Sequence, residues 1–199
     1  NPWNQEYWTG GSSSGSGAAV SAGLVPFALG SETGGSILSP SSSCGITGMR
    51  ATYGRVSRYG AMALSWTLDK IGPLALTADD CGLILHAISG PDPNDPSTSN
   101  RQFLYDPDHT PEKRFRLGVV RETVDLAQAD VKANFEKALD VLHTIADVDE
   151  IEFPEYPYHA VNQTILQAES VSAFDELNES GQVAQLTDPG NHYGGYTRS

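Results

Sequence analysis

Two clusters of glycine and serine near the beginning of the chain hold hydroxyl groups that could act as nucleophiles. The first cluster is GGSSSGSG, residues 10–17, and the second is GSETGGS, residues 30–36. A serine hydroxyl can attack a carbonyl carbon once a base takes its proton, and closely spaced backbone N–H groups can stabilise the resulting oxyanion. Glycine leaves such N–H groups uncrowded. The clusters therefore point to acyl-transfer chemistry.

A flexible linker is the alternative interpretation, because segments rich in glycine and serine often join domains. The residues between the clusters oppose it, since they include the apolar side chains of Val20, Leu24, Val25, Phe27 and Leu29. An apolar segment flanked by such clusters favours two tight loops that an ordered core brings together.

Other glycine-rich motifs fit less well. A phosphate-binding P-loop requires a lysine after its glycines, and the chain has no lysine before Lys70. A dinucleotide fingerprint that uses Gly15 and Gly17 requires Gly or Ala where the chain has Val20. The G-x-S-x-G nucleophile elbow does match at residues 11–15, but the residues before it do not resemble a buried strand. Nucleophilic attack by Ser13 stays as the alternative that this motif implies.

Histidine, the usual base for a serine nucleophile, does not occur near either cluster. The five histidines are His86, His109, His143, His159 and His192, and no His-Glu-x-x-His motif occurs. The two cysteines, Cys44 and Cys81, form no C-x-x-C pair, and we expect buried, reduced thiols in a reducing compartment. The sequence therefore predicts neither a metal site nor a cofactor.

The segment GGSSSGSGAAVSAGLVPFALGSETGGSI, followed by SCGITGMRATYGRVSRYG, resembles the amidase signature family. The resemblance covers most of the chain and is densest over residues 10–90. In that family, the serine of the Gly-Gly-Ser-Ile segment is the nucleophile. A second serine, in the upstream Gly-Gly-Ser-Ser segment, follows a cis peptide bond and relays the proton to a neutral lysine. The resemblance thus implies that Ser36 is the nucleophile and Ser12 the relay.

The same resemblance implies an oxyanion and substrate-binding set next to these serines. We expect it to comprise Thr33, Gly34, Gly35 and Ser13, with backbone N–H groups of the second loop turned toward the oxyanion. The lysine of the family lies some tens of residues upstream of the first loop, a position that precedes this chain. We therefore expect the chain by itself to be inactive, and we expect Lys70 to be structural.

The chain also departs from the family pattern around the nucleophile. The family often has Asp-Thr-Gly-Gly-Ser-Ile-Arg, whereas this chain has Glu32 in place of the acid and Leu38 in place of the arginine. The missing arginine weakens the expectation of a carboxylate on the substrate. We expect Glu32 to be a structural hydrogen-bond acceptor rather than a catalytic acid.

Strand and helix patterns alternate along the chain and predict an α/β fold. Helices are expected at residues 16–24, 78–88, 131–145 and 158–177, and strands at 26–31, 45–52, 115–120 and 148–153. Residues 90–100 are expected to form an exposed loop. The resemblance implies an α/β/α layered fold around a mixed sheet. We expect one partial domain over 1–199, truncated at both ends, with a signature core (1–90), a loop (91–114) and an α/β continuation (115–199).

The net charge of −13 comes from the part of the chain after Ala75, which is strongly acidic. Such a surface repels nucleic acids and anionic membranes, so we expect direct binding to neither. The expected partner is a small-molecule amide substrate, the expected location is the cytoplasm, and a homodimer stays open.

The expected reaction is hydrolysis of a carboxamide through an acyl-Ser36 intermediate. Two alternatives are the A subunit of a glutamine-dependent tRNA amidotransferase, which needs partner subunits, and a non-catalytic binding module. The missing arginine and the acidic second half of the chain weigh slightly against the amidotransferase.

Overall fold

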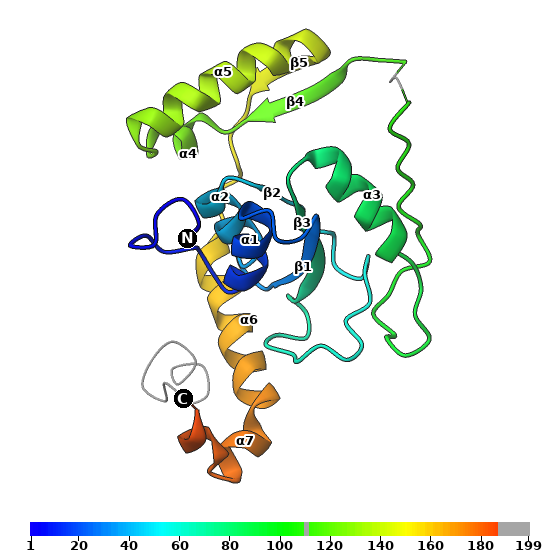
Figure 1. Ribbon diagram of the computed structural model, residues 1–199, viewed down its shortest axis with the longest axis vertical. Helices are drawn as coiled ribbons and strands as arrows, with labels where there is room; N and C mark the ends of the chain where they lie inside the picture. Colours follow the sequence, from blue (N-terminus) through cyan, green and yellow to red (C-terminus); the bar gives the residue numbers. More distant parts are fainter. Residues whose placement is uncertain (110–111, 187–199) are drawn as a thin grey trace. The chain divides into compact units, whose positions relative to one another are not determined.

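The computed structural model describes residues 1–109 and 112–186. The chain forms two compact units. Among the described residues, the first comprises Asn1–Pro107 together with His159–Leu186, and the second lies within Asp108–Tyr158. Both units combine helices with strands, as an α/β fold requires (Figure 1).

The first unit contains both glycine and serine clusters. Its elements are α1 (Ser14–Ser21), β1 (Phe27–Glu32), α2 (Leu38–Cys44), β2 (Thr47–Gly48), β3 (Lys70–Ala75), α3 (Ala78–Ile88), most of α6 (Tyr158–Ala173), α7 (Asp175–Glu179) and the short 3-10 helix η1 (Gln182–Gln185). The clusters therefore lead into α1 and out of β1, and α1 lies against β1.

The three strands of the first unit form an antiparallel sheet in the order β1-β3-β2. The register pairs Phe27 with Ala75 at one end of β1 and Glu32 with Lys70 at the other. The sequence patterns do not predict the central strand β3. Its Gly72-Pro73 pair is typical of a turn, so the local sequence does not indicate a strand. The segment is a strand because it pairs with β1 on one side and β2 on the other.

The first cluster packs tightly on the beginning of α2. Gly10 has a φ of +83°, and a Cβ atom built on it would lie 2.5 Å from the backbone of Pro40. Only glycine fits a position that combines a left-handed backbone with such a close approach. Ile37 and Cys44, at either end of α2, are fully buried. The segment between the two clusters forms the end of α1 and the beginning of β1, so it is ordered and not a linker. Of the five apolar side chains on which the sequence prediction of a core rests, however, only Val20 is buried.

The predicted helix at residues 78–88 is confirmed with its cap. The hydroxyl of Thr77 accepts a hydrogen bond from the backbone N–H of Asp80 at 3.1 Å, and α3 ends at Ile88. Leu85 of this helix packs with Ala51 and Val56 in a buried cluster. The loop after α3 is only partly exposed, contrary to expectation, because Asp95 is buried there.

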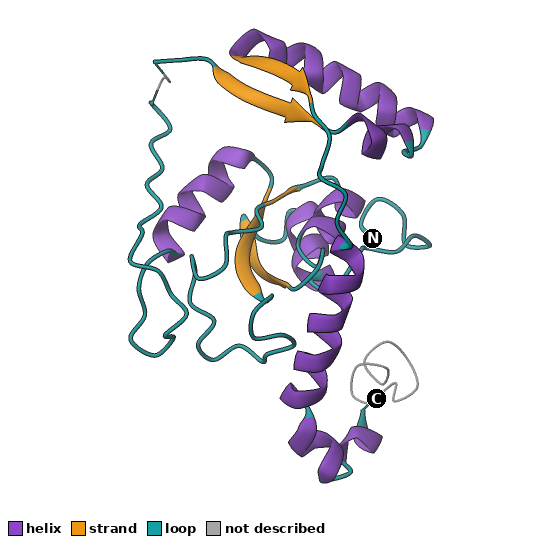
Figure 2. Ribbon diagram, turned by 180° about the vertical axis from the view of Figure 1, so that it is seen from behind, coloured by secondary structure: helices purple, strands orange, loops and turns teal. Residues whose placement is uncertain are grey.

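The second unit is a strand–helix–strand motif. Its parallel strands β4 (Phe115–Val119) and β5 (Ala146–Glu150) are joined through α4 (Arg121–Asp125) and α5 (Ala129–Ile145). Figure 2 shows α5 running along the two strands. The sequence predicts these two strands and the long helix, although β5 begins two residues earlier than expected, because its pairing with β4 starts at Ala146.

The predicted helix at residues 158–177 is two helices. α6 ends at Ala173, and α7 begins at Asp175 after a break at Phe174, whose backbone is not helical. Within the described residues, no helix has both the length and the apolar character needed to cross a membrane.

Candidate active site

A backbone hydrogen bond joins the two glycine and serine clusters. The N–H of Ser13 donates to the carbonyl of Ser36 at 3.1 Å. The peptide bond between Gly11 and Ser12 is cis, which is the arrangement that the family resemblance implies before the relay serine. The side chain of Ser12 is exposed, and Ser36 is half-buried. The fold therefore brings both predicted catalytic serines into one pair of connected loops.

The carboxylate of Glu32 fixes the backbone that follows Ser36. Its Oε2 atom accepts hydrogen bonds from the backbone N–H groups of Ile37, at 2.8 Å, and Leu38, at 3.0 Å. Arg50 lies 3.5 Å from the other carboxylate oxygen, and the Glu32 side chain is fully buried. A buried carboxylate with two backbone donors and a cation is a structural acceptor, as we expect from the sequence.

Two carbonyl groups of the second cluster accept hydrogen bonds from other residues of the chain. The carbonyl of Thr33 accepts from Lys70 Nζ at 3.4 Å, and that of Gly35 accepts from the N–H of Ser39 at 2.7 Å. Among the described residues, no acceptor is found for the backbone N–H groups of Gly34, Gly35 and Ser36. Gly35 has a φ of +107°, which a residue with a side chain rarely adopts. The loop thus leaves consecutive donors available for an oxyanion.

The side chain of Ser13 is engaged in holding α1 on β1. Its hydroxyl donates to the carbonyl of Ser31 at 3.1 Å and accepts from the N–H of the same residue at 3.2 Å. Ser16 repeats this contact one turn later, donating to the carbonyl of Leu29 at 2.8 Å. These bonds give the Ser13 hydroxyl a structural task, and they do not favour the nucleophile-elbow interpretation.

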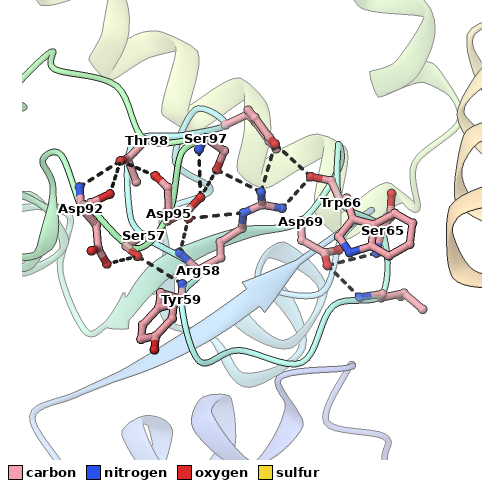
Figure 3. Close-up of polar contacts among 12 residues, drawn as sticks. Ser57, Arg58, Tyr59, Ser65, Trp66, Asp69, Asp92, Asp95, Ser97 and Thr98 are labelled. Carbon is pink, nitrogen blue, oxygen red and sulfur yellow. Dashed lines mark hydrogen bonds and ion pairs between the residues drawn. The ribbon is translucent and has the colours of Figure 1, made fainter. Parts of the chain in front are cut away.

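Asp69 also contacts the second cluster, although no sequence motif identifies it. Its Oδ1 atom accepts from the hydroxyl of Thr33 at 2.6 Å. Its Oδ2 atom accepts from the backbone N–H groups of Leu64 and Ser65, at 2.8 and 3.0 Å (Figure 3). The only sequence feature that could have identified it is its position directly before β3, which itself was not predicted.

Lys70, the residue after Asp69, lies beside the same loop. Burial lowers the pKa of its ammonium group, and the nearby charge of Arg50 lowers it further. Besides Thr33, Lys70 donates to the carbonyl of Leu68. Because both bonds go to backbone carbonyls, the contacts of Lys70 are those of a structural residue.

A second acidic residue extends these contacts to α6. Glu169 accepts hydrogen bonds from the hydroxyl of Ser65 and from the backbone N–H and hydroxyl of Thr67, the last two at 3.0 and 2.7 Å. Burial alone would raise the pKa of the Glu169 carboxyl, but the hydrogen bonds from Ser65 and Thr67 outweigh it, and the pKa is lowered. Glu169 therefore binds the loop as a carboxylate.

Arg58 also binds the loop of residues 65–67 that Glu169 contacts. Its guanidinium donates to the carbonyl of Trp66 at 2.7 Å, and to the hydroxyl groups of Tyr53 and Ser97 at 3.0 Å each. Its backbone N–H donates to Asp95 at 2.8 Å (Figure 3). A cavity of about 410 Å³ lies beside this arrangement, and Asp69 forms part of its wall. Its lining includes Ser31 of the second cluster but neither Ser12 nor Ser36.

Cysteine and histidine have no part in these contacts. Cys44 and Cys81 are free and fully buried, and burial raises the pKa of each thiol. Within the part of the chain that the structure describes, no three acidic, histidine or cysteine side chains gather as a metal site would require.

Comparison with curated proteins finds relatives in bacteria. The A subunit of glutamyl-tRNA(Gln) amidotransferase from Roseiflexus castenholzii is 49% identical over 162 residues, which cover 79% of this chain and 33% of that protein. The corresponding protein of Neisseria meningitidis serogroup C is 39% identical over 202 residues, covering 98% of this chain and 42% of that protein.

Solved structures of related proteins also match this chain. The crystal structure of the A subunit of glutamyl-tRNA(Gln) amidotransferase from Thermotoga maritima matches with a TM-score of 0.81 and 37% identity, covering 98% of this chain and 46% of the other. The native peptide amidase from Stenotrophomonas maltophilia matches with a TM-score of 0.73 and 29% identity, covering 92% and 39%. The chain spans less than half the length of each of these proteins. The family model described as Amidase matches residues 1–192, and the chain therefore belongs to the amidase family.

Proposed function

We propose that this chain carries the nucleophile and the relay serine of an enzyme that hydrolyses a carboxamide C–N bond. The products are a carboxylic acid and ammonia or an amine. The observation that carries the proposal is the hydrogen bond from the N–H of Ser13 to the carbonyl of Ser36, which joins the two serine loops. The N–H groups that follow Thr33, which lack an acceptor among the described residues, support it further.

In the proposed reaction, the Oγ atom of Ser36 attacks the amide carbon and forms a tetrahedral oxyanion. The proton of Ser36 passes to Ser12, whose own proton passes to a base, which in the family is a lysine. The N–H groups of Gly34, Gly35 and Ser36 stabilise the oxyanion. The C–N bond then breaks, the amine takes the proton back through Ser12, and an acyl ester of Ser36 remains. Water cleaves this ester and restores the serine.

A second candidate is the A subunit of a glutamine-dependent tRNA amidotransferase. The relatives with 39–49% identity carry that name, which supports this candidate despite the missing arginine after the nucleophile. Both candidates share the acyl-Ser36 step and differ in the substrate, since the amidotransferase releases ammonia from glutamine and works with partner subunits. For either candidate we propose a cytoplasmic location, supported by the two free thiols.

The full-length gene product should distinguish the candidates. An amidase hydrolyses simple aryl amides without partners, whereas the amidotransferase releases ammonia from glutamine and copurifies with other subunits. Ser36→Ala should abolish either activity. Full turnover of the preferred amide by the Ser36→Ala variant would contradict the proposed function. If the wild-type protein cleaves neither substrate, with or without copurified subunits, the binding-module alternative replaces it.

A further inference from the structure

The orientation of an oxyanion donor depends on the carbonyl group in the same peptide unit. A trans peptide is planar, and its C=O and N–H point in opposite directions. The carbonyl of Thr33 shares its peptide unit with the N–H of Gly34. Whatever holds the Thr33 carbonyl therefore also sets the direction in which the Gly34 N–H points.

Two neighbouring residues hold Thr33 from the beginning of β3. Asp69 accepts from the Thr33 hydroxyl at 2.6 Å, and Lys70 donates to the Thr33 carbonyl at 3.4 Å. Asp69 is only 8% exposed, so this short bond has little competition from water. Thr33, in the second loop, is thus fixed at its side chain and at its carbonyl.

The carboxylate of Asp69 is itself held in place. The N–H groups of Leu64 and Ser65 bind its second oxygen, and Glu169 of α6 in turn binds the hydroxyl of Ser65. A continuous series of hydrogen bonds therefore runs from α6 through Ser65 and Asp69 to Thr33. Part of it, from Ser65 to Asp69, can be followed in Figure 3.

We propose that Asp69 is a positioning residue that acts through Thr33 to direct the Gly34 N–H at the oxyanion. This inference rests on the proposed function, because it requires acylation of Ser36. It predicts that loss of the Thr33–Asp69 bond impairs the transition state more than substrate binding. Removal of a whole oxyanion donor typically costs about 10²–10³ in kcat, so a misdirected donor should cost about 10-fold to 100-fold.

The test compares Thr33→Val, which removes the hydroxyl but keeps the branched shape, with Thr33→Ser, which keeps the hydroxyl. In the full-length gene product, Thr33→Val should lower kcat by about 10-fold to 100-fold with KM within about threefold. Thr33→Ser should restore most of the activity. Asp69→Asn should lower kcat as Thr33→Val does, and it decides the matter should Thr33→Val not fold.

Ser57→Ala is the matched control. The hydroxyl of Ser57 donates to Asp92 Oδ2 at 2.6 Å, the same length and chemistry as the Thr33–Asp69 bond, and Ser57 lies outside the proposed site. Ser57→Ala should reduce thermal stability and leave kcat unchanged.

Three results would overturn the inference: a kcat of Thr33→Val and Asp69→Asn within about twofold of the wild-type value, equal losses in Thr33→Val and Thr33→Ser, or a loss of the same size in Ser57→Ala. Failure of the inference is distinct from failure of the proposed function. If only the inference fails, Ser36→Ala still abolishes the wild-type activity, whereas Thr33→Val retains it. If the proposed function fails, the Ser36→Ala variant itself retains the activity.

Discussion

At the scale of single residues, the site combines side chains that do chemistry with side chains that hold the backbone. Ser36 and Ser12 belong to the first kind in the proposed function, whereas Glu32 and Ser13 make contacts of the second kind. The proposal for the first kind comes from serine motifs and the family resemblance, because nucleophile chemistry restricts the residue type and its spacing. The second kind depends on which backbone groups the fold leaves without a partner. The sequence predicts the structural role of Glu32, but it does not predict the partners of Ser13 and Asp69.

Ser12 provides a prediction at this scale. Its side chain is exposed, so Ser12→Ala should change the free energy of unfolding by no more than about 0.5 kcal/mol. A serine that relays a proton acts in the transition state, and its loss should lower kcat of the full-length protein by about 10²–10⁴-fold. Steady-state kinetics and urea denaturation of the same preparation check both statements. A variant that keeps its full kcat would show that Ser12 relays no proton.

At the scale of helices and strands, the sequence predicts those elements whose patterns are local. The capped helix α3 and the amphipathic helix α5 are found where expected, because capping and apolar periodicity both lie within the helix itself. The strand β3 was not predicted, since its glycine and proline disguise a segment that pairs with β1 and β2. Because β3 was not predicted, Asp69 was not identified either, since its contact with Thr33 depends on its position directly before that strand.

The loop after α3 gives a prediction at this scale that depends on pH. The backbone N–H of Arg58 and then the hydroxyl of Ser97 lower the pKa of the Asp95 carboxyl. A carboxyl whose pKa is lower in the folded state stabilises that state above its unfolded pKa, about 3.9. This stabilisation is lost as the pH falls through the folded pKa. Asp95→Asn should therefore cost about 1–3 kcal/mol at pH 7, and the difference from wild type should shrink below about pH 4.

Urea denaturation at several pH values measures this difference. Asp140→Asn is the control, because Asp140 is exposed on α5 and should affect stability little at any pH. If the destabilisation caused by Asp95→Asn stays constant down to acidic pH, the charge of Asp95 has no part in fastening the loop.

At the scale of the whole molecule, the chain exposes apolar side chains that proteins of this size usually bury. On β1, Phe27 and Leu29 are 46% and 45% exposed, and β1 pairs with β3 along only one edge among the described residues. In the proposed function, the chain contributes the nucleophile loop, the relay loop and the backbone donors.

The central claim is that Ser36, and not another serine of the two clusters, forms the covalent intermediate. Treating the full-length protein with a fluorophosphonate probe, followed by peptide mass spectrometry, tests this most directly, because the probe reacts with activated serine hydroxyls. We predict a single adduct on Ser36 that is absent from the Ser36→Ala variant and strongly reduced in Ser12→Ala. An adduct on Ser13, whose hydroxyl is bound to the backbone of Ser31, would contradict the account and favour the nucleophile elbow.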